Sequence, residues 1–281
     1  MPELPEVETV RRGLNQVTLN QFIKGGEVCL ERTVAYPFNA GDFLLGLTQQ
    51  SLVQWHRRGK YLLGELQNSA GAGGWLGVHL RMTGQLLWLP QAVPLQPHCR
   101  IRLFFNGDRE LRFIDQRTFG RLWWVPPDQP LENIMPGLAK LGPEPFSSEF
   151  SVAYLEAALS KRQRPIKNAL LDQALVAGVG NIYADEALFL SGIQPTALCS
   201  RLKSKPIQRL HQALQQVLAA SIRVGGTTFS DFRSVEGING NYGGEAWVYN
   251  RAGKACRVCG TPIERIKLAG RSAHYCPTCQ R

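Results

Sequence analysis

The sequence lacks any long apolar run, and none approaches the roughly 20 residues that a helix needs to span a bilayer. It also lacks a secretory signal, because its first residues include glutamates where a signal would be basic and then apolar. Its seven cysteines are an odd count, which does not suit a framework of disulfides. These absences predict a cytoplasmic protein that needs no membrane. Its 281 residues are enough for two domains with hydrophobic cores.

Acidic residues are scarce at the C-terminal end. The whole chain has a net charge of +10, whereas residues 251–281 carry seven basic residues against Glu264 alone. More than half of the net charge therefore lies in this segment. Such a concentration suits a polyanion, because each phosphate contact releases counterions. A solubilising tail is the alternative, but the segment also contains a structural pattern.

That pattern is a set of cysteines with the spacing Cys256-x2-Cys259-x16-Cys276-x2-Cys279. Each pair turns two thiolates toward one point, and the 16 residues between the pairs suffice for a β-hairpin. Four thiolates in a tetrahedral array suit zinc and leave no open coordination position. We predict one structural Zn²⁺ and no organic cofactor. The isolated cysteines are expected to be small buried side chains: Cys29, Cys99 and Cys199.

The chain begins Met1-Pro2-Glu3, and removal of the initiator methionine would give Pro2 a free secondary amine. An α-amine ionises near pH ~8, against ~10.4 for lysine, so part of it is nucleophilic at neutral pH. Attack on a sugar carbon would form an iminium, as lysine does in other enzymes. Two carboxyl groups, those of Glu3 and Glu6, lie within one turn. Taken alone, the segment also fits an ordinary helix start.

The hydrophobic pattern changes along the chain from β-type to helical. Short strands are expected at 51–55, 61–66, 77–80, 85–89, 100–105 and 110–114, which is typical of a β-sandwich or barrel. Helices are expected at 6–19, 148–162, 165–173, 181–191 and 206–224. Six of the 17 prolines lie between Pro126 and Pro145, which indicates a domain boundary. The glycine-rich residues 225–253 resemble a functional lid or a disordered loop.

Five segments together resemble the formamidopyrimidine-DNA glycosylase family. In order, they are PELPEVETV at the start, HLRMTGQL at 79–86, DQRTFGRL at 115–122, GVGNIYADEAL at 178–188 and the four-cysteine finger. The resemblance implies a monomeric bifunctional enzyme that excises oxidised purines from duplex DNA and cleaves abasic sites. The implied substrates are formamidopyrimidines and 8-oxoguanine.

The resemblance also implies an α+β multidomain fold. Residues 1–130 would form the N-terminal helix and catalytic β-sandwich, and residues 131–147 a proline-rich linker. Residues 148–250 would form a helix–two-turn–helix domain that includes the glycine-rich lid 225–250. Residues 251–281 would form the zinc finger, with DNA held between the domains.

Roles for single residues follow from the same resemblance. Pro2 corresponds to the nucleophile at the anomeric carbon, Glu3 to the acid that assists ring opening, and Glu6 to its hydrogen-bonding support. Lys60 and Arg271 correspond to the residues assigned to β- and δ-elimination.

The DNA-binding residues are likewise implied by the resemblance. Asn181 corresponds to a phosphate ligand. Three side chains correspond to those that fill the gap left by the extruded base: Met82, Arg117 and Phe119. Weaker DNA contacts are implied for His79, His98, Arg162 and Lys167.

Two departures and two alternatives remain open at this point. Thr118 stands where many relatives have a basic residue, and the lid segment 238–247 differs from the pattern associated with 8-oxoguanine capping. The endonuclease VIII type, which takes oxidised pyrimidines, usually begins PEGPE, and Leu4 argues against it. A non-catalytic zinc-finger DNA-binding protein would explain the basic finger but would leave Pro2, Glu3 and Glu6 without a role.

Overall fold

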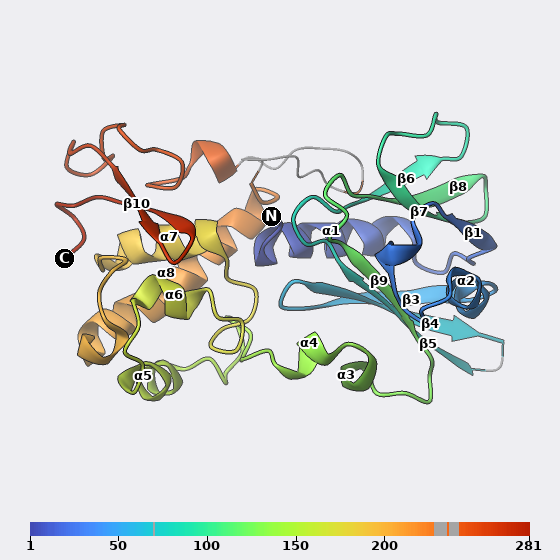
Figure 1. Cartoon of the computed structure of the whole chain (residues 1–281), viewed down its shortest axis with the longest axis horizontal. Coiled ribbons are helices and arrows are strands. Elements are labelled where there is room, and N and C mark those ends of the chain that lie inside the picture. Colours follow the sequence, from blue (N-terminus) through green and yellow to red (C-terminus); the bar gives the residue numbers. More distant parts are fainter. Residues whose placement is uncertain (70, 228–234, 236–241) are drawn as a thin grey trace. The chain divides into compact units, whose positions relative to one another are not determined.

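The computed structural model describes all residues except 70, 228–234 and 236–241. The chain divides into two units (Figure 1). Unit 1 comprises Met1–Ala139 and Gly225–Asn241, and unit 2 comprises Lys140–Val224 and Tyr242–Arg281. Over the part of the chain that is described, none of the helices has the length and apolar character to cross a membrane.

Unit 1 contains two β-sheets. The five-stranded sheet has the order β2 (Val34–Tyr36), β9 (Arg121–Val125), β5 (Gly71–His79), β4 (Tyr61–Asn68) and β3 (Ser51–Arg58). The four-stranded sheet has the order β1 (Gly25–Val28), β7 (Cys99–Phe104), β8 (Arg109–Ile114) and β6 (Gln85–Pro90). Neighbouring strands are antiparallel except β2 and β9, which are parallel.

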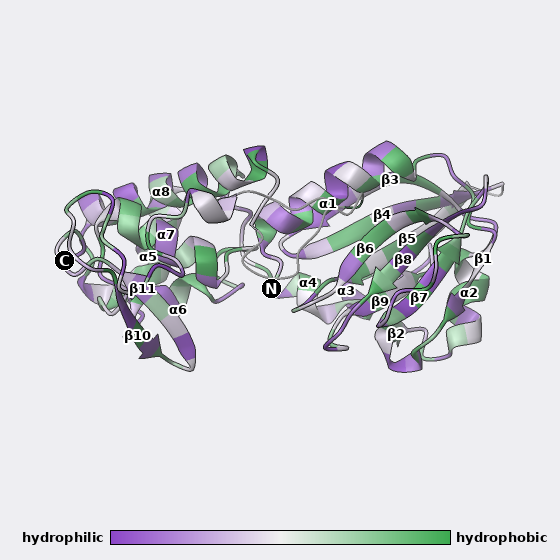
Figure 2. Ribbon diagram, turned by 90° about the horizontal axis from the view of Figure 1, so that it is seen from above, coloured by the Kyte–Doolittle hydropathy of each residue, from purple (hydrophilic) through white to green (hydrophobic). Residues whose placement is uncertain are grey.

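The two sheets share one hydrophobic core, so the predicted β-sandwich is confirmed. Trp55 and Leu76 from one sheet and Ile101 and Phe113 from the other belong to the same buried cluster. Along β7, buried and partly exposed residues alternate, as expected for a strand with one face on a core. Figure 2 shows many hydrophobic residues on the strands of both sheets.

Helix α1 (Leu4–Val17) belongs to unit 1 and packs on the sandwich through Val7, Val10 and Leu14. It begins two residues before the predicted 6–19 because Glu3 caps it. Two further helical segments of unit 1 are the 3₁₀ turn Glu31–Thr33 and α2 (Ala40–Leu47). Asn39 starts α2, since its side-chain oxygen accepts hydrogen bonds from the N–H groups of Gly41 and Asp42.

Unit 2 is helical, with a β-hairpin near its end. Its helices are α5 (Val152–Ser160), α6 (Ile166–Leu170), α7 (Asn181–Ser191) and α8 (Ser204–Arg223), with 3₁₀ turns at Cys199–Arg201 and Tyr242–Gly244. Strands β10 (Glu264–Leu268) and β11 (Arg271–Tyr275) form the hairpin expected between the cysteine pairs. The predicted helices are present, and the amphipathic α8 buries Ile207, Leu210 and Leu214 as its spacing indicates.

The proline-rich segment contains the one-turn helices α3 (Leu131–Ile134) and α4 (Pro136–Ala139), because proline is tolerated at the start of a helix. One expectation about the isolated cysteines was wrong. Cys29 is exposed, whereas Cys99 and Cys199 are buried as expected. The reason is position, since Cys29 directly follows β1, which lies at the edge of its sheet.

Candidate functional site

The N-terminus of α1 brings the first candidate residues together. Pro2 is buried, and Glu3 and Glu6 are 2% and 1% exposed. Glu3 and Glu6 form a reciprocal capping box, in which the Glu3 N–H donates to Glu6 Oε2 at 2.8 Å. Glu6 Oε1 accepts hydrogen bonds from the Thr227 N–H at 2.8 Å and from its hydroxyl at 3.3 Å. Glu6 therefore joins the start of α1 to the beginning of the glycine-rich segment within unit 1.

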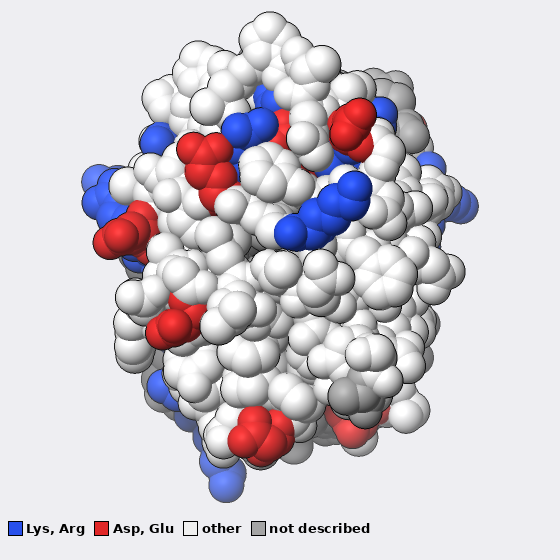
Figure 3. Space-filling view, turned by 90° about the vertical axis from the view of Figure 1, so that its right-hand side faces the viewer, with Lys and Arg blue, Asp and Glu red and all other residues white. Residues whose placement is uncertain are grey.

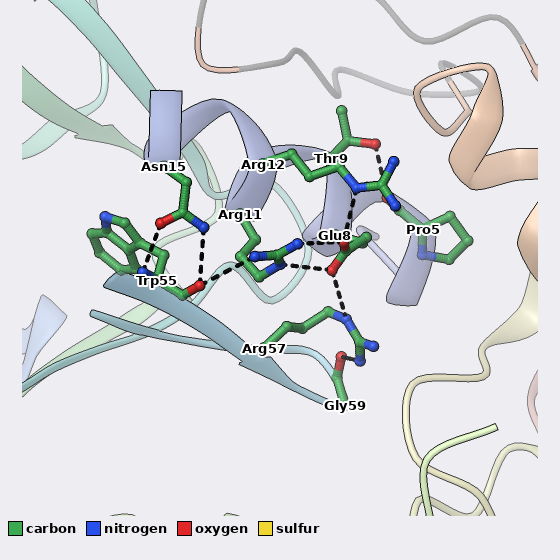
Figure 4. Close-up of polar contacts among 9 residues, drawn as sticks. All are labelled: Pro5, Glu8, Thr9, Arg11, Arg12, Asn15, Trp55, Arg57 and Gly59. Atoms are coloured by element: carbon green, nitrogen blue, oxygen red, sulfur yellow. Dashed lines mark hydrogen bonds and ion pairs between the residues drawn. The ribbon is translucent and has the colours of Figure 1, made fainter. Parts of the chain in front are cut away.

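One turn further along α1, Glu8 binds three arginines (Figure 4). Arg11 donates to both carboxylate oxygens, at 2.9 and 2.8 Å, and Arg12 donates at 2.9 Å. Arg57 of β3 donates from Nε at 3.3 Å and from Nη1 to the Gly59 carbonyl at 3.1 Å. Burial alone would raise the pKa of the Glu8 carboxyl, but these hydrogen bonds and charges outweigh it and lower the pKa to about 2.

The Glu8 cluster consequently links α1 to the β3–β4 turn that carries Lys60. Arg57 lies near the end of β3, and Lys60, which directly follows Gly59 in the turn, is only 6% exposed. A second set of bonds joins α1 to β3, since Asn15 accepts from the Trp55 N–H at 2.8 Å and donates to the Trp55 carbonyl at 3.1 Å. The candidate nucleophile lies just before α1 and Lys60 lies just after β3, and these two elements are joined at several points.

His79 lies at the end of β5, paired with Tyr61 of β4, and is 7% exposed. The pKa of His79 is lowered to about 3, mainly by burial and further by the positive charges of Arg81 and Lys60. The Arg81 N–H donates to His79 Nδ1 at 3.0 Å, which leaves the proton of the neutral ring on Nε2. His79 can therefore offer a neutral N–H donor to a ligand.

The three candidate gap-filling residues occupy two neighbouring loops of unit 1. Met82 is half-buried in the 80–84 loop, and Arg117 and Phe119 are exposed in the 115–120 loop. The Arg117 guanidinium lies over the Phe119 ring, 5.1 Å from its centroid. The hydroxyl of Thr118 accepts a hydrogen bond from Arg32, so a guanidinium is present at the position where Thr118 departs from the family pattern.

The exposed His98 lies close to this region, and its Nδ1 is 3.1 Å from Arg100 Nη2. The N–H of Asp115 donates to the His98 carbonyl at 3.0 Å, so His98 is connected to the 115–120 loop. The face of the sandwich unit shown in Figure 3 carries scattered Lys and Arg among Asp and Glu. Basic side chains do not gather on that face.

Unit 2 holds the remaining candidates for DNA contact. Asn181 is the first residue of α7 and follows Gly178, whose φ of 88° favours glycine. The oxygen of its side-chain amide has no hydrogen-bond partner among the described residues. Arg162 is half-buried and donates to Asp172 Oδ2 at 3.0 Å, a carboxylate that it shares with Arg164.

Lys167 differs from the other candidates because its side chain is 1% exposed. Its Nζ lies 2.6 Å from Asp185 Oδ1 and donates to the Ser272 carbonyl at 2.5 Å. Asp185 Oδ2 also accepts from the N–H of His274 at 2.9 Å. These contacts join α6 and α7 to strand β11, on which Arg271 is exposed next to Ser272.

The four predicted zinc ligands converge on one point. The sulfur atoms of Cys256, Cys259, Cys276 and Cys279 all lie within 4.8 Å of one another. This donor set and spacing fit a closed tetrahedral Zn²⁺ site, as predicted. The β10–β11 hairpin, which lies between the two cysteine pairs in the chain, exposes three basic side chains that line a shallow hollow: Arg265, Lys267 and Arg271.

Sequence reasoning missed two residues that organise the site. Glu8 has arginines three and four positions later, which is a recognisable helical ion-pair spacing. Asp115 is fully buried in the 115–120 loop, and no local pattern distinguishes it from a solvated turn residue.

The chain matches three family descriptions in succession. Residues 1–122 match the formamidopyrimidine-DNA glycosylase N-terminal domain, and residues 141–233 match the formamidopyrimidine-DNA glycosylase H2TH domain. Residues 253–281 match the zinc finger found in FPG and IleRS. The matches account for most of the chain and follow the order of its segments.

Individual relatives agree with these matches. The chain is 64% identical over 280 residues to the formamidopyrimidine-DNA glycosylase of Nostoc punctiforme, covering 100% of this chain and 96% of the relative. A crystal structure of a Lactococcus lactis FPG mutant with Fapy-dG-containing DNA is 35% identical, with a TM-score of 0.91 and full coverage of both chains. The MutM (FPG) protein of Thermus thermophilus is 39% identical, with a TM-score of 0.88 over 99% of this chain and 98% of that chain.

Proposed function

The chain belongs to the formamidopyrimidine-DNA glycosylase family of DNA repair enzymes, and we propose that it excises oxidised purines from duplex DNA. The proposal includes a covalent intermediate on Pro2 and cleavage of the abasic strand by β- and δ-elimination. The observation that carries it is the start of α1, where Pro2 adjoins two buried carboxyl groups and is linked through Glu8 and Arg57 to the turn with Lys60. A cytoplasmic location fits this role.

In this proposal the chemistry begins with the free amine of Pro2. The amine attacks the anomeric carbon, the bond to the damaged base breaks, and Glu3 gives a proton to the ring oxygen as the sugar opens. The resulting iminium acidifies the neighbouring sugar carbon. Loss of a proton from that carbon expels the 3′ phosphate, and a second elimination expels the 5′ phosphate. Water finally releases Pro2 from the sugar remnant.

Other residues support these steps. Glu6 holds the N-cap residue Glu3 through its backbone N–H, which fixes the direction of the chain at the nucleophile. We assign β-elimination to Lys60 and δ-elimination to Arg271, with Asn181 and the neutral His79 as donors to phosphates. His98 and Arg162 supply weaker backbone contacts. Lys167 is buried against Asp185, so we assign it to holding the strand that carries Arg271.

The damaged base must leave the duplex before Pro2 can reach its sugar. Met82, Arg117 and Phe119 supply two apolar groups and one guanidinium that can fill the resulting gap. Insertion of apolar side chains between bases is a general way to offset unstacking. Arg117 has only hydrogen-bond donors, so it favours an opposite base that presents acceptors, such as cytosine.

Zinc, when bound, supplies structure and no chemistry, because four thiolates fill its coordination sphere. The cysteines hold the β10–β11 hairpin so that its basic side chains can follow the DNA backbone. Phe189 and Val248 pack in the same buried cluster as Cys256 and Cys276, and they connect the zinc site to the rest of unit 2.

The substrate class is tested with duplexes that each contain one defined lesion. We expect faster excision of formamidopyrimidines and 8-oxoguanine than of oxidised pyrimidines. The solved Lactococcus lactis relative was crystallised with Fapy-dG-containing DNA, which supports formamidopyrimidines as substrates. Preference for oxidised pyrimidines would instead support the endonuclease VIII alternative. Residues 238–241 of the lid segment 238–247 lie outside the described residues, so this preference rests on experiment.

A further inference from the structure

The two loops that carry the gap-filling residues meet at one hydroxyl group. The Thr83 hydroxyl donates to Asp115 Oδ1 and accepts the N–H of Arg117 at 3.0 Å. Thr83 is the immediate neighbour of Met82, so the hydroxyl connects the 80–84 loop to the backbone of the 115–120 loop. The bridge uses its one proton and one of its two lone pairs.

Asp115 closes the second loop on itself. It is fully buried, and its Oδ2 accepts the N–H of Gly120 at 2.7 Å. The carboxylate therefore holds both the Thr83 hydroxyl and the far end of the loop that presents Arg117 and Phe119. A buried carboxylate keeps such bonds because leaving one unmade costs free energy.

Close packing beneath the loops leaves them little freedom. A Cβ atom on Gly84 would lie 2.9 Å from Phe113 Cζ, and one on Gly120 would lie 2.4 Å from the same atom. Both loops thus rest against one ring, which is 1% exposed in the sandwich core. The two loops therefore pack on the same aromatic ring and are also joined by the Thr83 bridge.

We propose that Thr83 is a positioning residue whose hydroxyl makes the two loops act as one wedge. With the bridge intact, Met82, Arg117 and Phe119 enter the duplex in a fixed arrangement, and the Arg117 guanidinium is aimed at the base opposite the lesion. Without it, each loop adopts its own position. The inference rests on the proposed function and adds a residue that controls recognition of the opposite base.

The test compares Thr83→Val, which removes the hydroxyl at nearly constant volume, with Thr83→Ser, which keeps it. Thr48→Val is the matched control, because among the described residues the hydroxyl of Thr48, which follows α2, bonds only the Leu44 carbonyl, at 2.7 Å. Two rates are measured under single-turnover conditions. One is excision of 8-oxoguanine opposite each natural base, and the other is elimination at an abasic site in single-stranded DNA.

We expect Thr83→Val to slow excision from duplex opposite cytosine by about tenfold, as loss of a part-buried hydrogen-bond bridge would. Its preference among opposite bases should flatten, while elimination on single-stranded DNA stays at the wild-type rate. Thr83→Ser and Thr48→Val should behave as wild type. Equal slowing on both DNAs, or an unchanged opposite-base preference, would overturn the proposal.

Folding is checked by thermal denaturation of each variant. If Thr83→Val does not fold, Thr83→Ala is used, since it removes the hydroxyl and adds no new contact. Failure of both to fold would assign the hydroxyl to stability and overturn its role in positioning. Inactivity of the wild-type protein on both DNAs would overturn the proposed function itself, and this inference with it.

Discussion

The carboxyl group of Glu3 has two uses at the start of α1. It caps the helix by accepting the N–H of Glu6, and in the proposed reaction it gives a proton to the sugar. A glutamine at this position keeps a carbonyl oxygen for the cap but cannot release a proton. The two uses can therefore be separated by one substitution.

We predict that Glu3→Gln binds lesion DNA nearly as well as wild type, while base excision slows by roughly 10²–10⁴-fold, as for a lost acid–base group. Filter binding and single-turnover excision measure the two effects, with the exposed Glu149→Gln as control. Parallel loss of binding and excision would mark Glu3 as structural.

His79 gives a prediction about pH. Its folded-state pKa of about 3 lies below the ordinary 6.5 because of burial and nearby positive charge. Below pH 6.5 the His79 ring is protonated in the unfolded chain but stays neutral in the folded chain, so stability falls as the pH drops toward 3. At pH 5 this contribution is roughly 2 kcal/mol at most. Urea titrations at pH 7 and pH 5 measure how much stability each protein loses between the two pH values. His79→Gln should lose less than wild type. An equal loss in the two proteins would contradict the assignment.

At the scale of elements, the connection between α1 and β3 positions the proposed nucleophile. Helix α1 alone could bind its Glu8 to Arg11 and Arg12, but Arg57 arrives from a strand 49 residues later. The register of β3 with β4 decides where Arg57 and the following turn lie.

Glu8→Gln should therefore weaken both the fold and the site. The Glu8 carboxyl, with its pKa of about 2, stabilises the protein fully above pH 4.5, and this contribution disappears as the pH falls toward 2. We expect a loss of about 2 kcal/mol at pH 7, and a flatter dependence between pH 4.5 and 2 than in wild type. Urea denaturation across this range tests the prediction. A variant with the wild-type pH profile would show that the arginine cluster does not stabilise the fold.

The zinc finger is a second element with a separable role. We predict that Cys276→Ser loses bound zinc and affinity for duplex DNA, because the β10–β11 hairpin depends on the metal for its shape. The sandwich of unit 1 should stay folded, since its core contains none of the finger residues. Metal analysis, DNA binding and the thermal transition measure these three outcomes, with Cys199→Ser as control. Normal DNA binding by the metal-free variant would contradict the prediction.

The sequence predicted elements whose signal is local, and it missed those that depend on partners. Strands such as β7 alternate clearly, and the four-cysteine spacing is specific enough to predict the zinc site. Strand β1 was not predicted because its two glycines carry no hydrophobic pattern, and β2 was not predicted because it has only three residues. Neither the Thr83–Asp115 bridge nor the Lys167–Asp185 pair could be predicted, because each joins residues far apart in the chain.

In the whole molecule, charge and the proposed chemistry are divided between the two units. Unit 1 contains Pro2, Glu3, Lys60 and the proposed gap-filling residues, whereas unit 2 contains Asn181, Arg271 and the finger. The segment from residue 251 onward supplies +6 of the net charge of +10. The proposed reaction needs both units, because elimination is assigned to Lys60 in one and Arg271 in the other.

Borohydride trapping on duplex DNA with a single oxidised purine tests whether Pro2 is the nucleophile. Reduction of an iminium links the nucleophile irreversibly to the sugar, and peptide mass spectrometry then identifies the linked residue. We predict one linkage, at the nitrogen of Pro2, in protein that has lost Met1, and none in protein that retains it. A linkage at Lys60, or full glycosylase activity in protein with verified Met1, would contradict it.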